Sequence, residues 1–414
     1  MAALILLAAS VAGAPATTAR FGFTGFVIAY VVAAAAWVVA RRAALPFSTI
    51  IAITIVFRAL VLFAEPGLSN DVDRYMWDGR VLSSGANPYL RAPADSPGHE
   101  RINHPEIRTI YPPHAQLLFA AVHELWLWKL LILGCDVAIV ALLRSSPAAA
   151  LAYATFPPAI FEGVWNGHIE IVAALLLVIA VKRRSAIAAA ISVGLKISPI
   201  AALPALVLHS PHRLRFMAVF ALVLIVPAIP FMLTGPLMPG FRDFAYRWVF
   251  NSPAYDVALA MADASALKSL WTAVKDPLRL EAISPFVYRH LYDDFVARAL
   301  LAACAAAAIW KFRRNAPASI GALLLSSPVI HPWYWLVAAP IALLEGSGVI
   351  WFALFAPFSY LLYDGAPSLT VYLLCYAAPA ALIAWPRLSA IATSGAGWLR
   401  PATRFRRARG TSPP

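Results

Sequence analysis

The polar segment Asp71–Arg80 carries the residues whose types and spacing point most directly to chemistry. In a helix, residues four and seven positions apart share one face. This spacing gives the segment two polar faces, one with Asp71, Tyr75 and Asp78 and the other with Asp73, Trp77 and Arg80. A carboxylate held at a membrane interface beside aromatic rings has a raised pKa and can act as a general base on a hydroxyl group. Asp71 is therefore the candidate base.

Two other interpretations of this segment stay open. Asp71 can be a solvated carboxylate that pairs with Arg74 or Arg80. Alternatively, Asp71 and Asp73 form an Asp-x-Asp pair of the kind that holds a divalent metal ion on a diphosphate.

Lys196 and His331 are candidates for binding an anion. Lys196 interrupts the apolar stretch 191–208. At an outward-facing turn it would contact a headgroup or phosphate, and the alternative is a side chain that merely reaches the interface. His331 precedes Pro332 at a helix start, where the positive end of the dipole favours anions. The alternative places His331 in an interfacial aromatic belt with Trp333 and Tyr334.

A further turn carries Asn166, His168 and Glu170, which we interpret as substrate contacts. The His–Glu combination lacks a third ligand at metal spacing, so no zinc site is predicted. The three cysteines lie in apolar runs without CxxC spacing. They are interpreted as small buried hydrophobic residues.

The composition indicates that a membrane-embedded fold must position these residues. The chain has 414 residues, of which 61% are hydrophobic and 13% charged, and its mean hydropathy is +0.74. Soluble proteins carry about 25% charged residues, so this chain cannot cover a soluble surface. The net charge of +13 is concentrated in short turns and an arginine-rich tail. This pattern predicts contact with anionic membrane lipid rather than nucleic acid.

Apolar runs of membrane-helix length recur along the chain, which predicts an all-α polytopic membrane protein of about 12 to 14 crossings. Short basic loops stay in the cytoplasm. This rule predicts cytoplasmic termini and a single transmembrane domain over residues 1–386, followed by a basic cytoplasmic tail, 387–414. Two large outer loops are predicted at 65–113 and 234–294, the second with Trp248, Tyr255, Trp271 and Tyr288 over the substrate. The stretch 185–208 is predicted to be a broken hairpin with Lys196 at its outward turn.

Three charged residues fall inside apolar runs. Arg58, Asp136 and Lys196 would together cost about 8–10 kcal/mol if each stood unpaired in the membrane. We therefore expect an Arg58–Asp136 pair and a polar environment for Lys196. With the predicted topology, the other polar clusters converge on the outer face. That placement is typical of an enzyme at the outer leaflet, whereas a channel or transporter would distribute polar residues along a path.

Several short motifs lie along the chain. The first polar loop carries Asp71–Tyr75 (DVDRY), Trp77–Arg80 (WDGR), Gly85–Tyr89 (GANPY) and Tyr111–Pro113 (YPP). Later in the chain stand the shorter strings Asn166–His168 (NGH), Gly194–Lys196 (GLK) and Ser327–Tyr334 (SPVIHPWY). On these motifs the sequence resembles bacterial GT-C glycosyltransferases, and more narrowly the polyprenyl-phosphate-mannose-dependent mannosyltransferases of glycosyltransferase family 87. These include phosphatidylinositol mannoside and lipoglycan mannosyltransferases.

The resemblance implies a GT-C fold in a bacterial plasma membrane and an extracytoplasmic active site. The enzyme would transfer a hexose, most simply mannose, from a polyprenyl-phosphate donor to a hydroxyl of a glycolipid or glycan acceptor, with inversion. Asp71 would be the base, and Lys196 and His331 would bind the donor phosphate. The substrate contacts expected beside them are Asp73, Arg74, Tyr75, Asp78, Arg80, Tyr111, Asn166, His168, Glu170, Trp333 and Tyr334. No metal or other cofactor is expected.

Two residues depart from the family pattern. Asp73 stands where many relatives have a non-acidic residue, and His168 where many have Gln. The alternatives are a GT-C enzyme that uses another lipid-linked sugar, such as arabinose or glucose, and a flippase or transporter of lipid-linked glycans.

Overall fold

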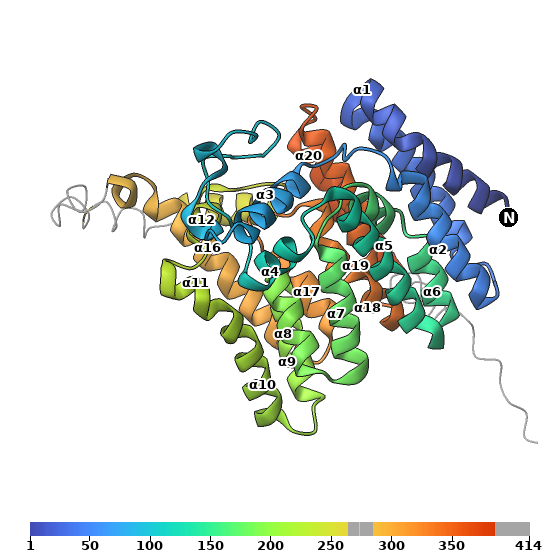
Figure 1. Cartoon of the computed structure of the whole chain (residues 1–414). Helices are drawn as coiled ribbons and strands as arrows, with labels where there is room; N and C mark the ends of the chain where they lie inside the picture. Colours follow the sequence, from blue (N-terminus) through green and yellow to red (C-terminus); the bar gives the residue numbers. More distant parts are fainter. Residues whose placement is uncertain (264–272, 274–284, 386–414) are drawn as a thin grey trace, which may run out of the picture.

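The computed structural model describes residues 1–263, 273 and 285–385, and nearly all of its regular structure is helical (Figure 1). Among these residues the only strand-like pairing is an isolated parallel bridge between Phe250 and Val329. The predicted all-α class is therefore confirmed. The predicted tail, 387–414, lies outside the described residues, as do Trp271 and the side chain of Tyr288.

Several helices are long and apolar enough to cross a membrane. The four that meet this condition among the described residues are Ala2–Ala40, Leu125–Ser145, Arg213–Thr234 and Ser368–Trp385. A fifth candidate is a pair of helices, Ala159–Trp165 and Glu170–Arg183, bent by 116° at a short break. Shorter apolar helices surround them, so the chain has the helices of a membrane protein. The count of 12 to 14 crossings stays a prediction.

The first helix, α1 (Ala2–Ala40), folds back on itself at Gly22, whose φ of 63° only glycine adopts readily. Ser10 Oγ donates a hydrogen bond to the Ala29 carbonyl, 19 residues away, so the two halves lie side by side. The next helices of the N-terminal half are α2 (Phe47–Leu62), α3 (Asp71–Ser83), α4 (Pro113–Ala121), α5 (Leu125–Leu142) and α6 (Pro147–Ala154).

The expected Arg58–Asp136 pair joins α2 to α5. Arg58 Nε lies 2.9 Å from Asp136 Oδ2, and neither side chain is exposed. Tyr153 donates to the second carboxylate oxygen at 2.6 Å, and Arg58 also donates to the Ala154 carbonyl. The free-energy cost of burying these two charges is therefore offset by their ion pair and hydrogen bonds, as the sequence predicted.

The middle of the chain supplies the broken elements that reach the site. The π-helix η4 (Ala159–Trp165) and α7 (Glu170–Arg183) flank the bend, and α8 (Ala186–Leu195) packs on α7. After Lys196 the chain continues as η5 (Ser198–Ala202) and α9 (Leu203–Leu208), which is the broken arrangement expected for 185–208. The following helices are α10 (Arg213–Ile225), η6 (Val226–Ala228), α11 (Ile229–Thr234) and α12 (Pro239–Arg247).

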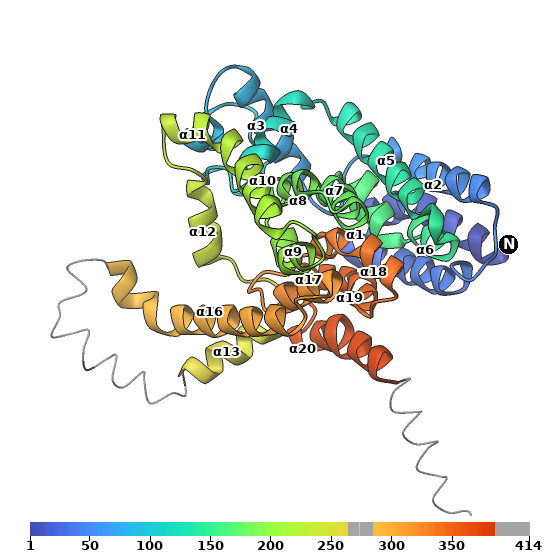
Figure 2. The ribbon, with the colours of Figure 1, turned by 90° about the horizontal axis from the view of Figure 1, so that it is seen from below.

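The C-terminal part closes the core. Figure 2 shows α13 (Pro253–Asp263) and α16 (Pro285–Lys311) side by side at one edge of the molecule. The remaining elements are α17 (Ala316–Leu325), η7 (Pro332–Val337), α18 (Ala339–Glu345), α19 (Val349–Phe355), η8 (Ala356–Leu362), α20 (Ser368–Tyr372) and η9 (Leu373–Ala377). One hydrophobic core cluster draws side chains from α1 through η8 and therefore fixes both halves around the candidate site.

Candidate functional site

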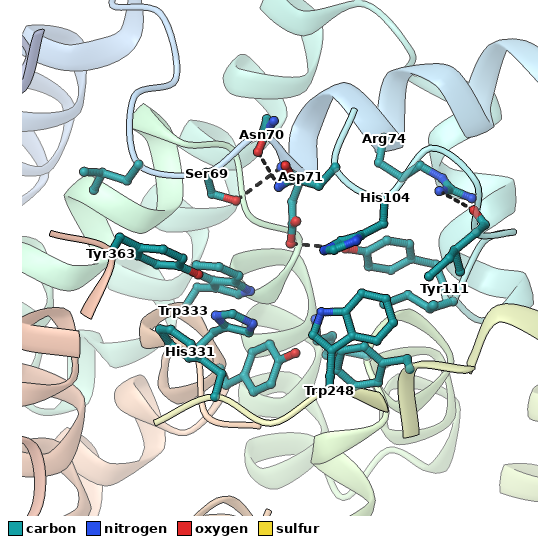
Figure 3. Close-up of a pocket in the computed structure, with 18 of the residues that line it drawn as sticks. Ser69, Asn70, Asp71, Arg74, His104, Tyr111, Trp248, His331, Trp333 and Tyr363 are labelled. Carbon is teal, nitrogen blue, oxygen red and sulfur yellow. Dashed lines mark hydrogen bonds between the residues drawn. The ribbon is translucent and has the colours of Figure 1, made fainter. Parts of the chain in front are cut away.

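A cavity of about 450 Å³ lies where the first polar segment meets the C-terminal helices. Figure 3 shows Asp71 pointing into it, with His331 and Trp333 on the opposite wall and Tyr363 and Trp248 on either side. The sequence-predicted residues that line this cavity are Asp71, Arg74, Tyr111, Lys196, His331, Trp333, Tyr334 and, from the second loop, Trp248. Segments far apart in the chain therefore meet here.

Helix α3 begins at Asp71 for local reasons. Asp71 and Asp73 stand in its first turn, where carboxylates interact favourably with the helix dipole. The backbone before α3 is held by Asn166, whose Oδ1 accepts hydrogen bonds from the N–H groups of Gly67 and Leu68 at 3.0 and 2.8 Å. Asn166 is fully buried at the break of the bent pair. It fixes the position of Asp71 without lining the cavity.

Opposing effects act on the pKa of Asp71. Burial raises its pKa above the ordinary value for aspartate, whereas the charges of Lys196, Arg74 and His104 and a hydrogen bond from Tyr111 act in the opposite direction. The Tyr111 hydroxyl donates to Asp71 Oδ2 at 3.3 Å. The carboxylate is therefore partly desolvated yet supported in its ionised form.

Arg74 forms an ion pair with Asp78, which does not line the cavity. Its Nε lies 2.9 Å from Asp78 Oδ1 and its Nη1 donates to the Ile107 carbonyl at 2.9 Å. Asp78 is buried, and its other oxygen accepts from Gln116 at 3.1 Å. Asp78 thus orients Arg74 and does not itself line the cavity.

Three further predicted residues of α3 lie away from the cavity. Asp73 pairs with Arg101 at 3.4 Å. Tyr75 is buried against Phe119 with ring centroids 4.6 Å apart, and its hydroxyl lies 3.4 Å from that of Tyr111. Arg80 is exposed beside a separate surface pocket. The structure therefore brings Asp71 to the cavity and leaves Asp73 outside it.

Lys196 stands between this cavity and a second one of about 610 Å³. The second cavity has a mostly apolar lining from α12, α16 and α17, including Phe241, Phe295 and Leu323. The two cavities share a wall of five residues, which are Ile110, Tyr111, Lys196, Phe244 and Tyr334. The Lys196 ammonium lies 4.6 Å from the Tyr334 ring centroid and 5.5 Å from that of Tyr111.

Glu170 and His168 are fully buried behind the cavity. Glu170 Oε1 lies 2.7 Å from Lys196 Nζ, so this lysine has an acidic partner that the sequence analysis did not assign to it. His168 Nε2 lies 3.5 Å from Glu162 Oε2. The turn 166–170 thus supports the cavity wall from behind.

His331 and Trp333 belong to a column of stacked rings. Trp333 lies between His168 and His331, with centroid distances of 4.1 and 4.4 Å. Phe250 continues the stack at 4.5 Å from His331, followed by Tyr363 at 5.3 Å. This packing fixes the His331 ring in one plane at the cavity wall.

Sequence reasoning missed several lining residues, namely Phe23, Arg108, Phe244, Phe250 and Tyr363. Phe23 follows the Gly22 fold-back within α1, and Tyr363 follows the last residue of η8. Neither position carries a motif, and only the fold brings them to the site. Tyr255, expected to cover the substrate, instead donates its hydroxyl hydrogen bond to Asp294 between α13 and α16.

The site combines one partly buried carboxylate, one lysine at the boundary of an apolar cavity and a wall of aromatic rings. Such a set can remove a proton from a hydroxyl and hold an anion attached to an apolar chain. Within the described ranges, no three His, Cys, Asp or Glu side chains group together as a metal site requires. Comparison of the chain with protein-family models, with curated proteins and with solved structures found no match.

Proposed function

We propose that this protein is a membrane glycosyltransferase of the GT-C type. It moves a hexose, most simply mannose, from a polyprenyl-phosphate donor to a hydroxyl of a glycolipid or glycan acceptor, at the outer face of a bacterial plasma membrane.

The observation that carries the proposal is the shared wall of the two cavities. A polyprenyl-phosphate sugar has a long apolar chain, one anionic phosphate and a polar sugar. The apolar cavity suits the chain, the Lys196 ammonium at the boundary suits the phosphate, and the cavity that contains Asp71 suits the sugar and the acceptor hydroxyl. Aromatic walls are a common surface for apolar sugar faces, and Trp248 and Tyr363 supply them here.

The proposed reaction is a single displacement. Asp71 takes the proton of the acceptor hydroxyl while that oxygen forms a bond to the anomeric carbon of the sugar. The bond between the anomeric carbon and the phosphate oxygen breaks, and its electron pair leaves with the polyprenyl phosphate. Lys196 and His331 stabilise the departing phosphate. One carboxylate suffices for this inverting route, so β-linked mannose becomes α-linked.

Sugar transfer by membranes that contain the protein tests the proposal. Radiolabelled polyprenyl-phosphate-mannose and a mixed pool of native lipids serve as substrates for the wild type, Asp71→Asn and Asp73→Asn. A general base contributes about 10²- to 10⁴-fold to the reaction rate. We therefore expect the transfer rate of Asp71→Asn to fall by at least about 10²-fold. Asp73→Asn is the matched control, because Asp73 lies on the same helix but outside the cavity.

Equal transfer by the wild type and Asp71→Asn, at equal amounts of folded protein, would remove Asp71 as the base. A wild type that transfers no sugar from mannose, arabinose or glucose donors would remove the glycosyltransferase proposal. The transporter alternative, which the broken helix pair favours, would then take its place.

A further inference from the structure

Glu170 contacts the shared wall from behind, through Lys196. It is the first residue of α7 and is fully buried, whereas Lys196 follows the last residue of α8 and is 16% exposed. Lys196 lines both cavities, and Glu170 lines neither. Lys196 is therefore the residue through which Glu170 can act on a bound ligand by direct contact.

The pairing between these residues is exclusive in the part of the chain that the structure describes. The only ion pair of Glu170 there is the 2.7 Å contact with Lys196. A buried carboxylate is costly unless a counter-charge compensates it. The Lys196 side chain therefore extends toward Glu170, and its ammonium lies near the rings of Tyr334 and Tyr111.

We infer that Glu170 is a positioning residue that aims the Lys196 ammonium and limits how tightly it holds the phosphate of a lipid ligand. The phosphate as ligand rests on the proposed function. Glu170 directs one side of the ammonium inward and leaves the remaining N–H donors toward the two cavities. Its negative charge also lies behind the lysine and opposes part of the attraction for a second anion.

This arrangement makes a distinctive kinetic prediction. A phosphate held by an uncompensated lysine would bind tightly but leave slowly after the sugar has been transferred. Glu170→Gln removes the charge and keeps the shape of the side chain. We expect the dissociation constant for sugar-free polyprenyl phosphate to fall about fivefold or more. Both KM for the donor and kcat should fall with it, whereas a merely structural role would weaken binding.

The experiment uses the purified full-length protein in lipid nanodiscs. Binding of sugar-free polyprenyl phosphate is measured for the wild type, Glu170→Gln, Glu170→Asp and Glu65→Gln, and thermal unfolding is measured alongside. Glu65 is the matched control because its carboxylate is exposed and pairs with Arg101 outside both cavities. Glu170→Asp keeps the charge but withdraws it by one methylene, so kcat should fall while the dissociation constant stays within about twofold.

The inference is overturned if folded Glu170→Gln binds polyprenyl phosphate as weakly as, or more weakly than, the wild type. If that variant does not fold, an unchanged kcat in Glu170→Asp overturns it instead. Failure of the proposed function is a separate result. A wild type that binds polyprenyl phosphate but transfers no sugar removes the enzyme assignment and leaves the binding comparison valid.

Discussion

Replacing Asp136 with asparagine tests the buried pair that joins α2 and α5. The substitution keeps the shape of the side chain and removes the negative charge 2.9 Å from Arg58 Nε, where neither residue is exposed. Breaking one side of a buried ion pair costs about 3–5 kcal/mol, because the remaining charge is left without compensation. Arg58 keeps its hydrogen bond to the Ala154 carbonyl, so we expect the lower end, about 3 kcal/mol.

Unfolding of the purified protein in mixed micelles, followed by the fluorescence of its 13 tryptophans, measures this change. A double variant, Arg58→Met with Asp136→Leu, removes both charges and should recover most of the loss. Glu65→Gln breaks an exposed pair with Arg101, in which the side chains are 69% and 67% exposed, and should cost at most about 1 kcal/mol. Equal stability of Asp136→Asn and the wild type, or a double variant no better than the single one, would refute the reasoning.

Two further predictions concern the site. Tyr111→Phe removes the hydrogen bond that lowers the pKa of Asp71; because the base works only when ionised, the acid limb of a pH–rate profile should move to higher pH. Tyr75→Phe, whose hydroxyl contacts Tyr111 rather than the carboxylate, should move it less, and equal profiles for Tyr111→Phe and the wild type would contradict the assigned hydrogen bond. Asn166→Ala removes the acceptor for the N–H groups of Gly67 and Leu68, so stability should fall by about 1–3 kcal/mol and kcat with it. Asn87→Ala removes the side-chain cap of a short 3-10 helix outside the cavity and should leave kcat in place. A normal kcat in Asn166→Ala would show that Asn166 does not position Asp71.

Part of this structure follows from the sequence because the cost of burying charge is large. The Arg58–Asp136 pair was predictable from two charges in apolar runs, and the structure confirms it. The Asp71–Arg80 segment, whose two polar faces hold only if it is helical, is helical in α3. Both results rest on strong local constraints, namely desolvation and helical periodicity.

Other features could not be predicted because they depend on how broken helices pack. Glu170 and Lys196 are 26 positions apart, one at the start of α7 and the other just after α8, and no periodicity relates them. The column of rings around Trp333 draws on residues from four separate segments. The fold-back of α1 depends on Gly22, one of 20 glycines that look alike in the sequence.

The first polar segment both positions the Asp71 carboxylate and lines the cavity around it. The hydrogen bonds from Gly67 and Leu68 to Asn166 contribute to the first of these tasks from outside the segment. Asp71 lies three residues beyond Leu68, and the backbone before it is anchored to the bend of a core helix pair. The loop after α3 adds contacts of its own, between Arg101 and Asp73 and between the Ile107 carbonyl and Arg74. The portion that follows α3, residues 84–110, includes cavity-lining residues such as His104 and Arg108. We expect substitutions at those positions of this portion that do not contact α3 to leave the carboxylate in place. The architecture thus permits a change of partner molecule without rebuilding the reacting group, which is the kind of modularity from which related proteins with different specificities can diverge.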